Sequence, residues 1–561
     1  MKLFNQISGL YFLLVTSAGI SYGHCNAGSG NDSPSSKVAT NENISQKEFT
    51  PEMFGAIGDG QIHELSSQYN SLDEARKKFP NIRDLNITID GAAFQEAVDA
   101  ASKSGGTVVA RKKYAINFPI ITRDNVTIDG QNEGVIYNDR SRKQNVFHLA
   151  FFVGNHSASA FYKSADNSSY KLYDVAGSIT AGQDFVRLGK PSDISAFKTG
   201  QLVMVVSSFK RRQKQKKTGL PYHITISKIT KVQDGKLYFE YPIDENVDSA
   251  EVAANGGFDN MTGMNYGGVS NVTIKNFTIN AAQITQRAYG YKVHISNMKV
   301  NNAIRLVGIN AIAHSSFTNI SGSFGWRCIE VKTGTSDVLI KNINAVYQPL
   351  ADKGVLVDAI AIGEYNRDVT IDSFKIDFKN TGSKLPTINL HSRKATISNG
   401  EIISPMQTTG FLKFYNERYV ENPNFGCYGN TVNNVKFYGS NMMKNVMQVG
   451  EDDKEKKASG NKADNWAYQK NQKKKANASF NDDNGDNDNL LSDEDATANV
   501  PPSSNIVENC LFDAGSGSSF ADLVQGKQNV IRNCTFTKAR LKLSDNFRAN
   551  NNNVDNNKAL K

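Results

Sequence analysis

The chain has 561 residues, a formal net charge of +9 and 39% hydrophobic residues. Its 44 Gly and 13 Pro residues predict many turns, whereas the overall composition excludes a wholly disordered chain. Five cysteines, an odd number in a chain of this length, exclude a disulfide-dense scaffold.

The N-terminus has the pattern of an export signal, in which a lysine precedes an apolar run over residues 10–20 and small residues follow up to Gly23. This run is too short to span a bilayer, and no later stretch reaches the required length, so no transmembrane segment is predicted. We expect a secreted or periplasmic protein with a signal peptide over residues 1–23 and a flexible linker over residues 24–50. A lipid anchor at Cys25 is the less favoured alternative, because the histidine before it fits a lipoprotein signal poorly.

The first ordered segment is expected over residues 51–149, and it begins with the phrase "FGAIGDG" at residues 54–60. A helix over residues 91–103 follows, with Asp90 as its cap and a Gly-Gly pair starting at Gly105 as its end. A strand comes directly after this pair.

Residues 150–250 have a different pattern from the segments around them. Alternating runs separated by Gly turns predict a small antiparallel β insertion. The runs are "GQDFVRLGK", "GQLVMVVSS", "ITISKITKV" and "GKLYFEYPI". We expect this insertion to overhang the neighbouring coils and to form one wall of a cleft.

A degenerate repeat dominates the remaining chain. The copies are "NVTIDG" at 125, "NVTIKNFTI" at 271, "VHISNMKV" at 293, "DVLIKNINA" at 337, "DVTIDSFKI" at 368, "ATISNGEI" at 395, "NTVNNVKF" at 430, "NIVENCLF" at 505 and "NVIRNCTF" at 529. Several successive copies are roughly 20 to 30 residues apart, as one turn of a three-stranded solenoid requires. The central Asn can adopt a left-handed corner and hydrogen-bond from coil to coil. We therefore predict an all-β parallel β-helix, with core coils over residues 251–450 and last coils over residues 504–545.

The phrase "FGAIGDG", the helix containing "FQEA" and the "GGTVV" strand start together resemble the pectate-lyase-like superfamily. The resemblance implies a right-handed parallel β-helix of three sheets, whose open N-terminal end is plugged by the helix. It covers residues 51–131 and departs at an insertion over residues 61–88 and at "ARKKY". The phrases Asn-Thr-Asp, Gly-His-Gly and Arg-Ile-Lys of polygalacturonases are absent, so the resemblance assigns no catalytic residue.

The low-complexity segment 451–503 is expected to be a disordered insertion, because its composition cannot pack a core. Within it, "DDNGDNDNLLSDE" at residues 482–494 alternates oxygen donors as calcium loops do, but it lacks the glycine at the sixth position. No cofactor is therefore assigned, and calcium stays open. Residues 546–561 are expected to be a disordered tail. Cys510 and Cys534 are expected in adjacent coils, either bonded or as packed thiols.

The charge distribution points to the partner. Residues 451–495 carry eight Lys against twelve Asp and Glu, so the rest of the chain is more basic than the total of +9 suggests. An exported chain with a basic body favours an acidic polysaccharide. Nucleic acid is the second polyanion to consider, but it is not predicted as a partner, because no base-stacking or helix-turn-helix signature supports it. The oligomeric state is left undetermined.

The strand before each repeat copy points polar residues away from the core, so stacked coils should align them about 4.8 Å apart. The predicted ladder comprises Arg305, Glu330, Lys332, Ala361, Gly363, Asn389, His391, Lys413, Tyr415 and Gln448. Arg393, Trp326 and Tyr365 lie nearby in the sequence and are further candidates for substrate binding. The alternative is an ordinary solvated face with Lys–Glu cross-strand pairs.

Two enzymatic mechanisms remain open, together with a glycan-binding or adhesin-like protein without catalysis. In β-elimination on a uronic-acid polysaccharide, cations neutralise the substrate carboxylate while a base and an acid transfer protons. The cations would be Arg305, Lys332, Arg393 and Lys413, and the proton-transfer groups His391 and Tyr415. In glycoside hydrolysis, paired carboxylates flank the bond. Glu330 would then act with Asp358 or Glu364. Elimination is the preferred hypothesis.

Overall fold

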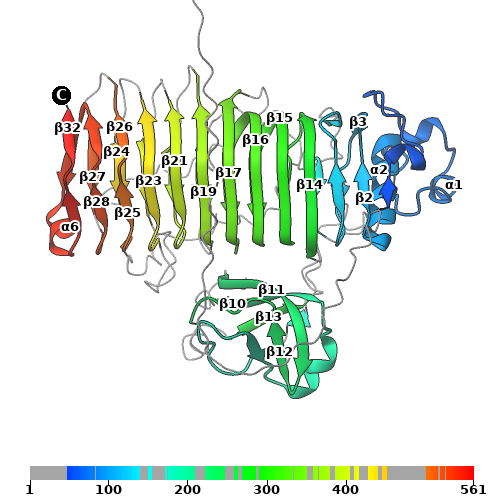
Figure 1. Ribbon diagram of the computed structural model, residues 1–561, viewed down its shortest axis with the longest axis horizontal. Coiled ribbons are helices and arrows are strands. Elements are labelled where there is room, and N and C mark those ends of the chain that lie inside the picture. Colours follow the sequence, from blue (N-terminus) through cyan, green and yellow to red (C-terminus); the bar gives the residue numbers. More distant parts are fainter. Residues whose placement is uncertain are drawn as a thin grey trace, which may run out of the picture. The chain divides into compact units, whose positions relative to one another are not determined.

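Strands that pair in parallel dominate the described part of the protein (Figure 1). The computed structural model describes residues 47–560, apart from residues 83, 333 and 525 and the ranges 139–148, 155–170, 173–174, 209–220, 247–257, 263–267, 286–289, 350–357, 364–365, 380–385, 405–409, 416–426, 440–444, 451–500 and 516–518. The expected all-β class is confirmed. No helix among these residues is long and apolar enough to cross a membrane.

The N-terminal part combines short helices with the first coils. Its elements are β1 (Glu48–Phe49), η1 (Pro51–Phe54), η2 (Leu65–Ser67), α1 (Leu72–Arg76), α2 (Ile89–Ser104), β2 (Thr107–Val109), β3 (Lys113–Ile116), β4 (Ile120–Ile121), β5 (Thr127–Asp129), β6 (Val135–Asn138) and β7 (Phe151–Phe152). Helix α2 places Phe94, Ala97 and Val98 in the same apolar core as the first strands, which confirms the expected capping helix. Because β1 pairs in parallel with β2, the predicted linker 24–50 already ends in a strand.

Asp90 does not cap α2, contrary to the sequence expectation. The cap is Thr88, whose side chain accepts a hydrogen bond from the Gly91 amide. Asp90 is buried, and its carboxylate accepts hydrogen bonds from the amides of Ile57 at 2.8 Å and Gly58 at 3.1 Å. The sequence pattern missed this role because the contact joins residues more than thirty positions apart.

The predicted β insertion forms an antiparallel sheet. Its elements are β8 (Lys171–Leu172), β9 (Phe185–Arg187), η5 (Pro191–Ala196), β10 (Leu202–Ser208), β11 (Pro221–Gln233), β12 (Lys236–Phe239) and β13 (Phe258–Thr262). The expected limits 150–250 need correction at both ends. Strand β7 pairs in parallel with β4 of the first coils, whereas β13 extends the insertion beyond residue 250.

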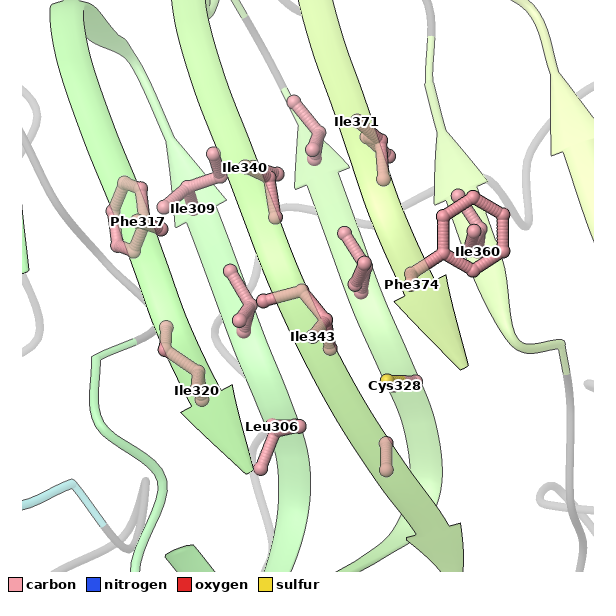
Figure 2. Packing of buried hydrophobic residues seen from close by; sticks show 14 of the residues in the cluster. Leu306, Ile309, Phe317, Ile320, Cys328, Ile340, Ile343, Ile360, Ile371 and Phe374 are labelled. Carbon is pink, nitrogen blue, oxygen red and sulfur yellow. The ribbon is translucent and has the colours of Figure 1, made fainter. Parts of the chain in front are cut away.

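The core coils stack strand upon strand in parallel register (Figure 1). Their strands are β14 (Val269–Asn280), β15 (Gly290–Asn310), β16 (Ile312–Lys332), β17 (Ser336–Tyr347), β18 (Ile360–Ile362), β19 (Arg367–Asp377), β20 (Ile388–Leu390), β21 (Thr396–Ile403), β22 (Gly410–Phe414), β23 (Thr431–Tyr438) and β24 (Asn445–Val449). Figure 2 shows how side chains such as Ile340, Ile343 and Ile371 fill the interior. This arrangement confirms the predicted parallel β-helix.

Asparagines in the repeat adopt the left-handed corner that the sequence predicts. Asn297, Asn319 and Asn342 have φ values of 56°, 56° and 57°. The Nδ2 of Asn319 donates to Oδ1 of Asn297 at 3.0 Å, and the Nδ2 of Asn342 donates to Oδ1 of Asn319 at 2.9 Å. The corner residues therefore form a hydrogen-bonded ladder that holds successive coils in register.

The C-terminal coils continue to the end of the described chain. They contain β25 (Ile506–Glu508), β26 (Leu511–Asp513), β27 (Ser519–Leu523), β28 (Val530–Arg532), β29 (Thr535–Thr537), β30 (Ala539–Leu543), α6 (Asp545–Ala549), β31 (Asn553–Asp555) and β32 (Lys558–Leu560). Strands β31 and β32 pair in parallel with β28 and β29, so the expectation of a disordered tail over residues 546–561 is wrong. Although this C-terminal segment is rich in Asn, it still has the alternating strand residues and the corner residues that one more coil needs.

Two further expectations concern the region around the low-complexity segment. Residues 451–500, including the acidic phrase at 482–494, lie outside the described residues. The expected segment ended at Ser503, but Ser503 forms parallel β-bridges with Tyr428 and Lys527 and therefore belongs to a coil. Cys510 and Cys534 are buried free thiols. The packed-thiol alternative therefore describes this pair.

Candidate functional site

The register of β16, β18, β20, β22 and β24 aligns the predicted ladder. Glu330 pairs with Ala361, Ala361 with Asn389, Asn389 with Lys413, and Lys413 with Gln448. Each pair joins neighbouring coils, which are about 4.8 Å apart in a sheet. From Glu330 to Gln448 this is the order expected from the sequence alternation. Arg305, the expected first member of the ladder, instead pairs in register with Arg327, and Gly308 pairs with Glu330.

A second row lies two residues further along the same coils. The amide of Gly363 donates to the Val331 carbonyl at 2.9 Å, that of His391 to Ile362 at 3.0 Å, and that of Tyr415 to Leu390 at 3.2 Å. These bonds extend the parallel pairing past the ends of β18, β20 and β22. We call the two rows, with the charged groups that contact them, the polar face. Its second row comprises Lys332, Gly363, His391 and Tyr415.

His391 and Tyr415 are in direct contact on the polar face. Their ring centroids are 3.5 Å apart, with an angle of 62° between the ring planes. The ammonium group of Lys413 is 4.4 Å from the centroid of the Tyr415 ring. An imidazole, a phenol and a cation thus share one place on two adjacent coils.

Glu330 is the anionic centre of the polar face. Its carboxylate forms ion pairs with Arg305 and Arg327, and the Nζ of Lys332 lies 3.5 Å from its Oε1. Arg327 also donates from Nε to Oδ1 of Asp358 at 2.5 Å. Three cations therefore surround Glu330, and one of them connects it to a second carboxylate.

The sequence analysis missed Arg327 because a local irregularity changes the direction of its side chain. The amides of Cys328 and Ile329 both donate to the carbonyl of Ala359. Two residues on one strand then face one on its neighbour, as in a β-bulge. Simple alternation is broken at this point, so no period-2 pattern predicts that Arg327 shares a face with Glu330.

The polar face is more buried than its outward position suggested. Glu330, Asn389 and His391 are only 3%, 5% and 6% exposed, whereas Lys413 and Tyr415 are partly buried. Burial, together with the positive charges of Lys413 and Arg327, holds the pKa of His391 well below its ordinary value. His391 is therefore neutral near pH 7, so its imidazole offers a lone pair to a proton, although the same burial and charges make it a weaker base than a free histidine.

Three other predicted residues have different outcomes. The indole of Trp326 contacts two guanidinium groups, with the Cζ atoms of Arg305 and Arg327 at 4.0 Å and 5.0 Å from the ring centroid. Tyr365 lies outside the described residues, as does Glu364, a candidate carboxylate of the hydrolase alternative. Arg393 is not in either row of the polar face: its Nη1 lies 2.8 Å from Oε1 of Glu245 in the segment that follows β12. Arg393, expected to bind substrate, is thus paired with a carboxylate of the insertion.

Comparison with known proteins finds no matching family model and no matching curated sequence. Among solved structures, the chain is similar to the tailspike protein gp49 from Pseudomonas phage LKA1, with 13% identity, coverage of 89% of this chain and 84% of that one, and a TM-score of 0.43. It is similar to the surface adhesin PfbA of Streptococcus pneumoniae, with 11% identity, coverage of 92% and 93%, and a TM-score of 0.39. It is also similar to the A-module of the mannuronan C-5 epimerase AlgE6 of Azotobacter vinelandii, with 12% identity, coverage of 91% and 99%, and a TM-score of 0.36. These likenesses concern the fold alone.

The charge balance of the polar face favours an anionic ligand. Its charged members are the cations Arg305, Arg327, Lys332 and Lys413 and the carboxylates Glu330 and Asp358. With His391 neutral, these members leave an excess of positive charge in a largely desolvated setting, where electrostatic interactions are stronger than in water. Among the described residues, no group of three or more His, Cys, Asp and Glu side chains is placed to hold a metal ion.

Proposed function

We propose that the protein acts on an acidic polysaccharide at the polar face, and that it cleaves the chain by β-elimination. The contact between His391 and Tyr415 beside Lys413 is the observation that carries this proposal. An imidazole, a phenol and a cation in mutual contact would supply the proton acceptor, the proton donor and the charge neutralisation that elimination next to a carboxylate requires, and this supports the proposal.

The proposed reaction begins with charge neutralisation. Lys413 and Lys332, the more exposed cations of the polar face, bind the uronate carboxylate and make the adjacent C–H more acidic. Neutral His391 accepts this proton, and the electron pair of the C–H bond forms the new C=C bond. The glycosidic C–O bond breaks at the same time, and the Tyr415 hydroxyl protonates the leaving oxygen. Every step uses a group of the polar face.

Glycoside hydrolysis is the less supported alternative on this geometry. It requires one carboxylic acid that donates a proton and one carboxylate that acts as base or nucleophile. Glu330 and Asp358 both accept hydrogen bonds from Arg327, and Glu330 also pairs with Arg305. Cations stabilise the ionised form of a carboxyl group and so oppose the protonation that a general acid needs.

A screen of acidic polysaccharides against the purified full chain tests the proposal. Elimination leaves an unsaturated product that absorbs in the near ultraviolet, and each cleavage also creates one reducing end. We expect both signals to appear together on at least one uronic-acid polymer. Reducing ends without absorbance would favour hydrolysis, and binding without either signal would favour a glycan-binding protein. A screen in which no polymer is bound or cleaved would refute the proposal.

A further inference from the structure

Two buried arginines of adjacent coils bind two consecutive acids of the insertion. Arg367 and Arg393 pair across a parallel bridge, and their side chains are 3% and 2% exposed. Arg367 donates from Nε and Nη2 to the two carboxylate oxygens of Asp244, both at 2.7 Å. Arg393 pairs with Glu245 at 2.8 Å. The segment after β12 thus supplies a carboxylate to each guanidinium.

Polar contacts also join the neighbouring residues of this segment to the coils. The hydroxyl of Tyr291 donates to Oε2 of Glu240 at 2.9 Å, and the ring of Tyr241 stacks on His314 with centroids 4.1 Å apart. The insertion has an apolar core of its own, which includes Val186 and is separate from that of the coils. Charged and aromatic contacts therefore hold the insertion at this position.

The segment bound by Glu245 also carries His391. Arg393 follows His391 by two residues, and the intervening Ser392 is fully buried. Backbone bonds hold this short segment at both ends, from the His391 amide to Ile362 and from the Arg393 amide to Asn366, each at 3.0 Å. A displacement of Arg393 must therefore be absorbed within two residues of His391.

We propose that Glu245 is a positioning residue for the proposed elimination. By compensating the charge of Arg393, it holds that guanidinium inside the protein and so keeps His391 against Tyr415. Without Glu245 the buried cation loses its direct counter-charge, and the remaining nearby carboxylate, Asp244, is already bound to Arg367; escape of the guanidinium to solvent then pulls the end of β20 outward. The insertion is then part of the catalytic apparatus, although Glu245 itself touches no substrate. This inference rests on the proposed function for its catalytic consequence, but not for the docking itself.

Glu245→Gln is the main test, with hydrogen exchange and kinetics as separate readouts. We expect faster amide exchange in the peptide covering residues 388–393 and a loss of turnover of about 10²-fold, as a misplacement of about 1 Å can cause. KM should change little, because Lys332 and Lys413 stay in place. Glu401→Gln is the matched control: it removes a carboxylate from the surface pair with Lys375, 2.8 Å long, and should alter neither readout.

A second variant separates positioning from loss of fold. In the double variant Glu245→Gln with Arg393→Met, no uncompensated charge remains, so exchange protection and most of the turnover should return. Should Glu245→Gln fail to fold, Glu245→Asp, which keeps the charge at a longer distance, should show a smaller change in the same direction. Wild-type protection of residues 388–393 in both single variants would overturn the inference. If the wild-type protein cleaves no polysaccharide, the proposed function fails, while the exchange data still decide whether Glu245 holds this segment.

Discussion

Asn389 donates a hydrogen bond of 2.8 Å from Nδ2 to Oδ2 of Asp358, on the neighbouring coil. The other oxygen of Asp358 accepts from Arg327, which also pairs with Glu330. Both carboxylates of the polar face are thus partners of buried polar groups. Glu330 and Asp358 mainly compensate positive charge inside the protein. We therefore expect substitutions of these residues to lower the stability of the fold more than the rate of the reaction.

Glu330→Gln should lower the free energy of unfolding by about 3–5 kcal/mol, because it removes the buried carboxylate that Arg305 and Arg327 share and leaves Arg327 with Asp358 alone. Turnover per folded molecule should fall less than in variants of the proton-transfer pair. Urea unfolding followed by tryptophan fluorescence measures the first quantity. Glu401→Gln, at a more exposed ion pair, should leave the unfolding midpoint unchanged. A Glu330→Gln protein of normal stability but no activity would instead support the hydrolase alternative.

Tyr415→Phe and His391→Gln should each reduce kcat by 10²–10⁴-fold on a polymer that the wild-type protein cleaves, because each removes one proton-transfer group. Lys413→Ala should cause a comparable loss through the substrate carboxylate. Circular dichroism at the assay temperature checks that each variant is folded. Full activity in all three would show that the polar face is not the catalytic site.

The sequence was sufficient to predict the rows of the polar face but not their surroundings. Alternation with a period of two places Glu330, Asn389 and Lys413 on one side, and the corner asparagines set the length of each coil, so the order of these residues follows from local pattern alone. The ion pair of Arg393 with Glu245 instead depends on how a distant insertion docks. No local pattern carries that information.

Burial was the other property that could not be predicted. An outward position on a strand predicts contact with solvent, and on that basis alone replacement of His391 or Lys413 would cost little stability. The structure shows His391 only 6% exposed and with its ring against that of Tyr415. The depth of such a residue depends on the bulk of its neighbours on several coils.

Gly363→Ala should be tolerated, whereas Gly400→Ala should not. Among the described residues, a Cβ at Gly363 would meet only Val331 O at 3.5 Å and Asn366 Nδ2 at 3.7 Å, both ordinary contacts. A Cβ at Gly400 would overlap the ring of Phe374. We expect the first variant to gain up to about 1 kcal/mol in stability through reduced chain entropy, and the second to lose about 1–3 kcal/mol through overpacking. Equal melting temperatures for the two variants would contradict this prediction.

The small residue at Gly363 should also matter for substrate. It lies on the coil between Lys332 and His391, where a large side chain would occupy space above the polar face. Gly363→Phe should therefore raise KM for the cleaved polymer by at least tenfold while the protein remains folded. Gly363→Ala is the matched control, and its KM should stay near the wild-type value. An unchanged KM in the Phe variant would place the substrate elsewhere.

The acid stability of the protein should depend on His391. Burial is the main cause that holds the pKa of this imidazole well below its ordinary value, and the charges of Lys413 and Arg327 add to it. In the unfolded chain the same group titrates near pH 6.5, as a free histidine does. Above that pH both states are neutral at this position, so His391 adds no pH dependence there. Below pH 6.5, the unfolded state binds a proton that the folded state does not. The free energy of unfolding therefore decreases as the pH is lowered.

His391→Gln removes this difference in proton uptake. Between pH 6.5 and the depressed pKa of His391, the wild-type free energy of unfolding should fall by up to about 1.4 kcal/mol per pH unit more steeply than that of the variant. Urea unfolding of both proteins at several pH values between 7.5 and about 4.5 measures the difference, and subtraction cancels the titration of groups common to both. Parallel curves would mean that His391 takes up a proton in the folded state as readily as in the unfolded chain. The depressed pKa attributed to its burial would then be wrong, whereas a base with the ordinary pKa of histidine would still suit the proposed elimination near neutral pH.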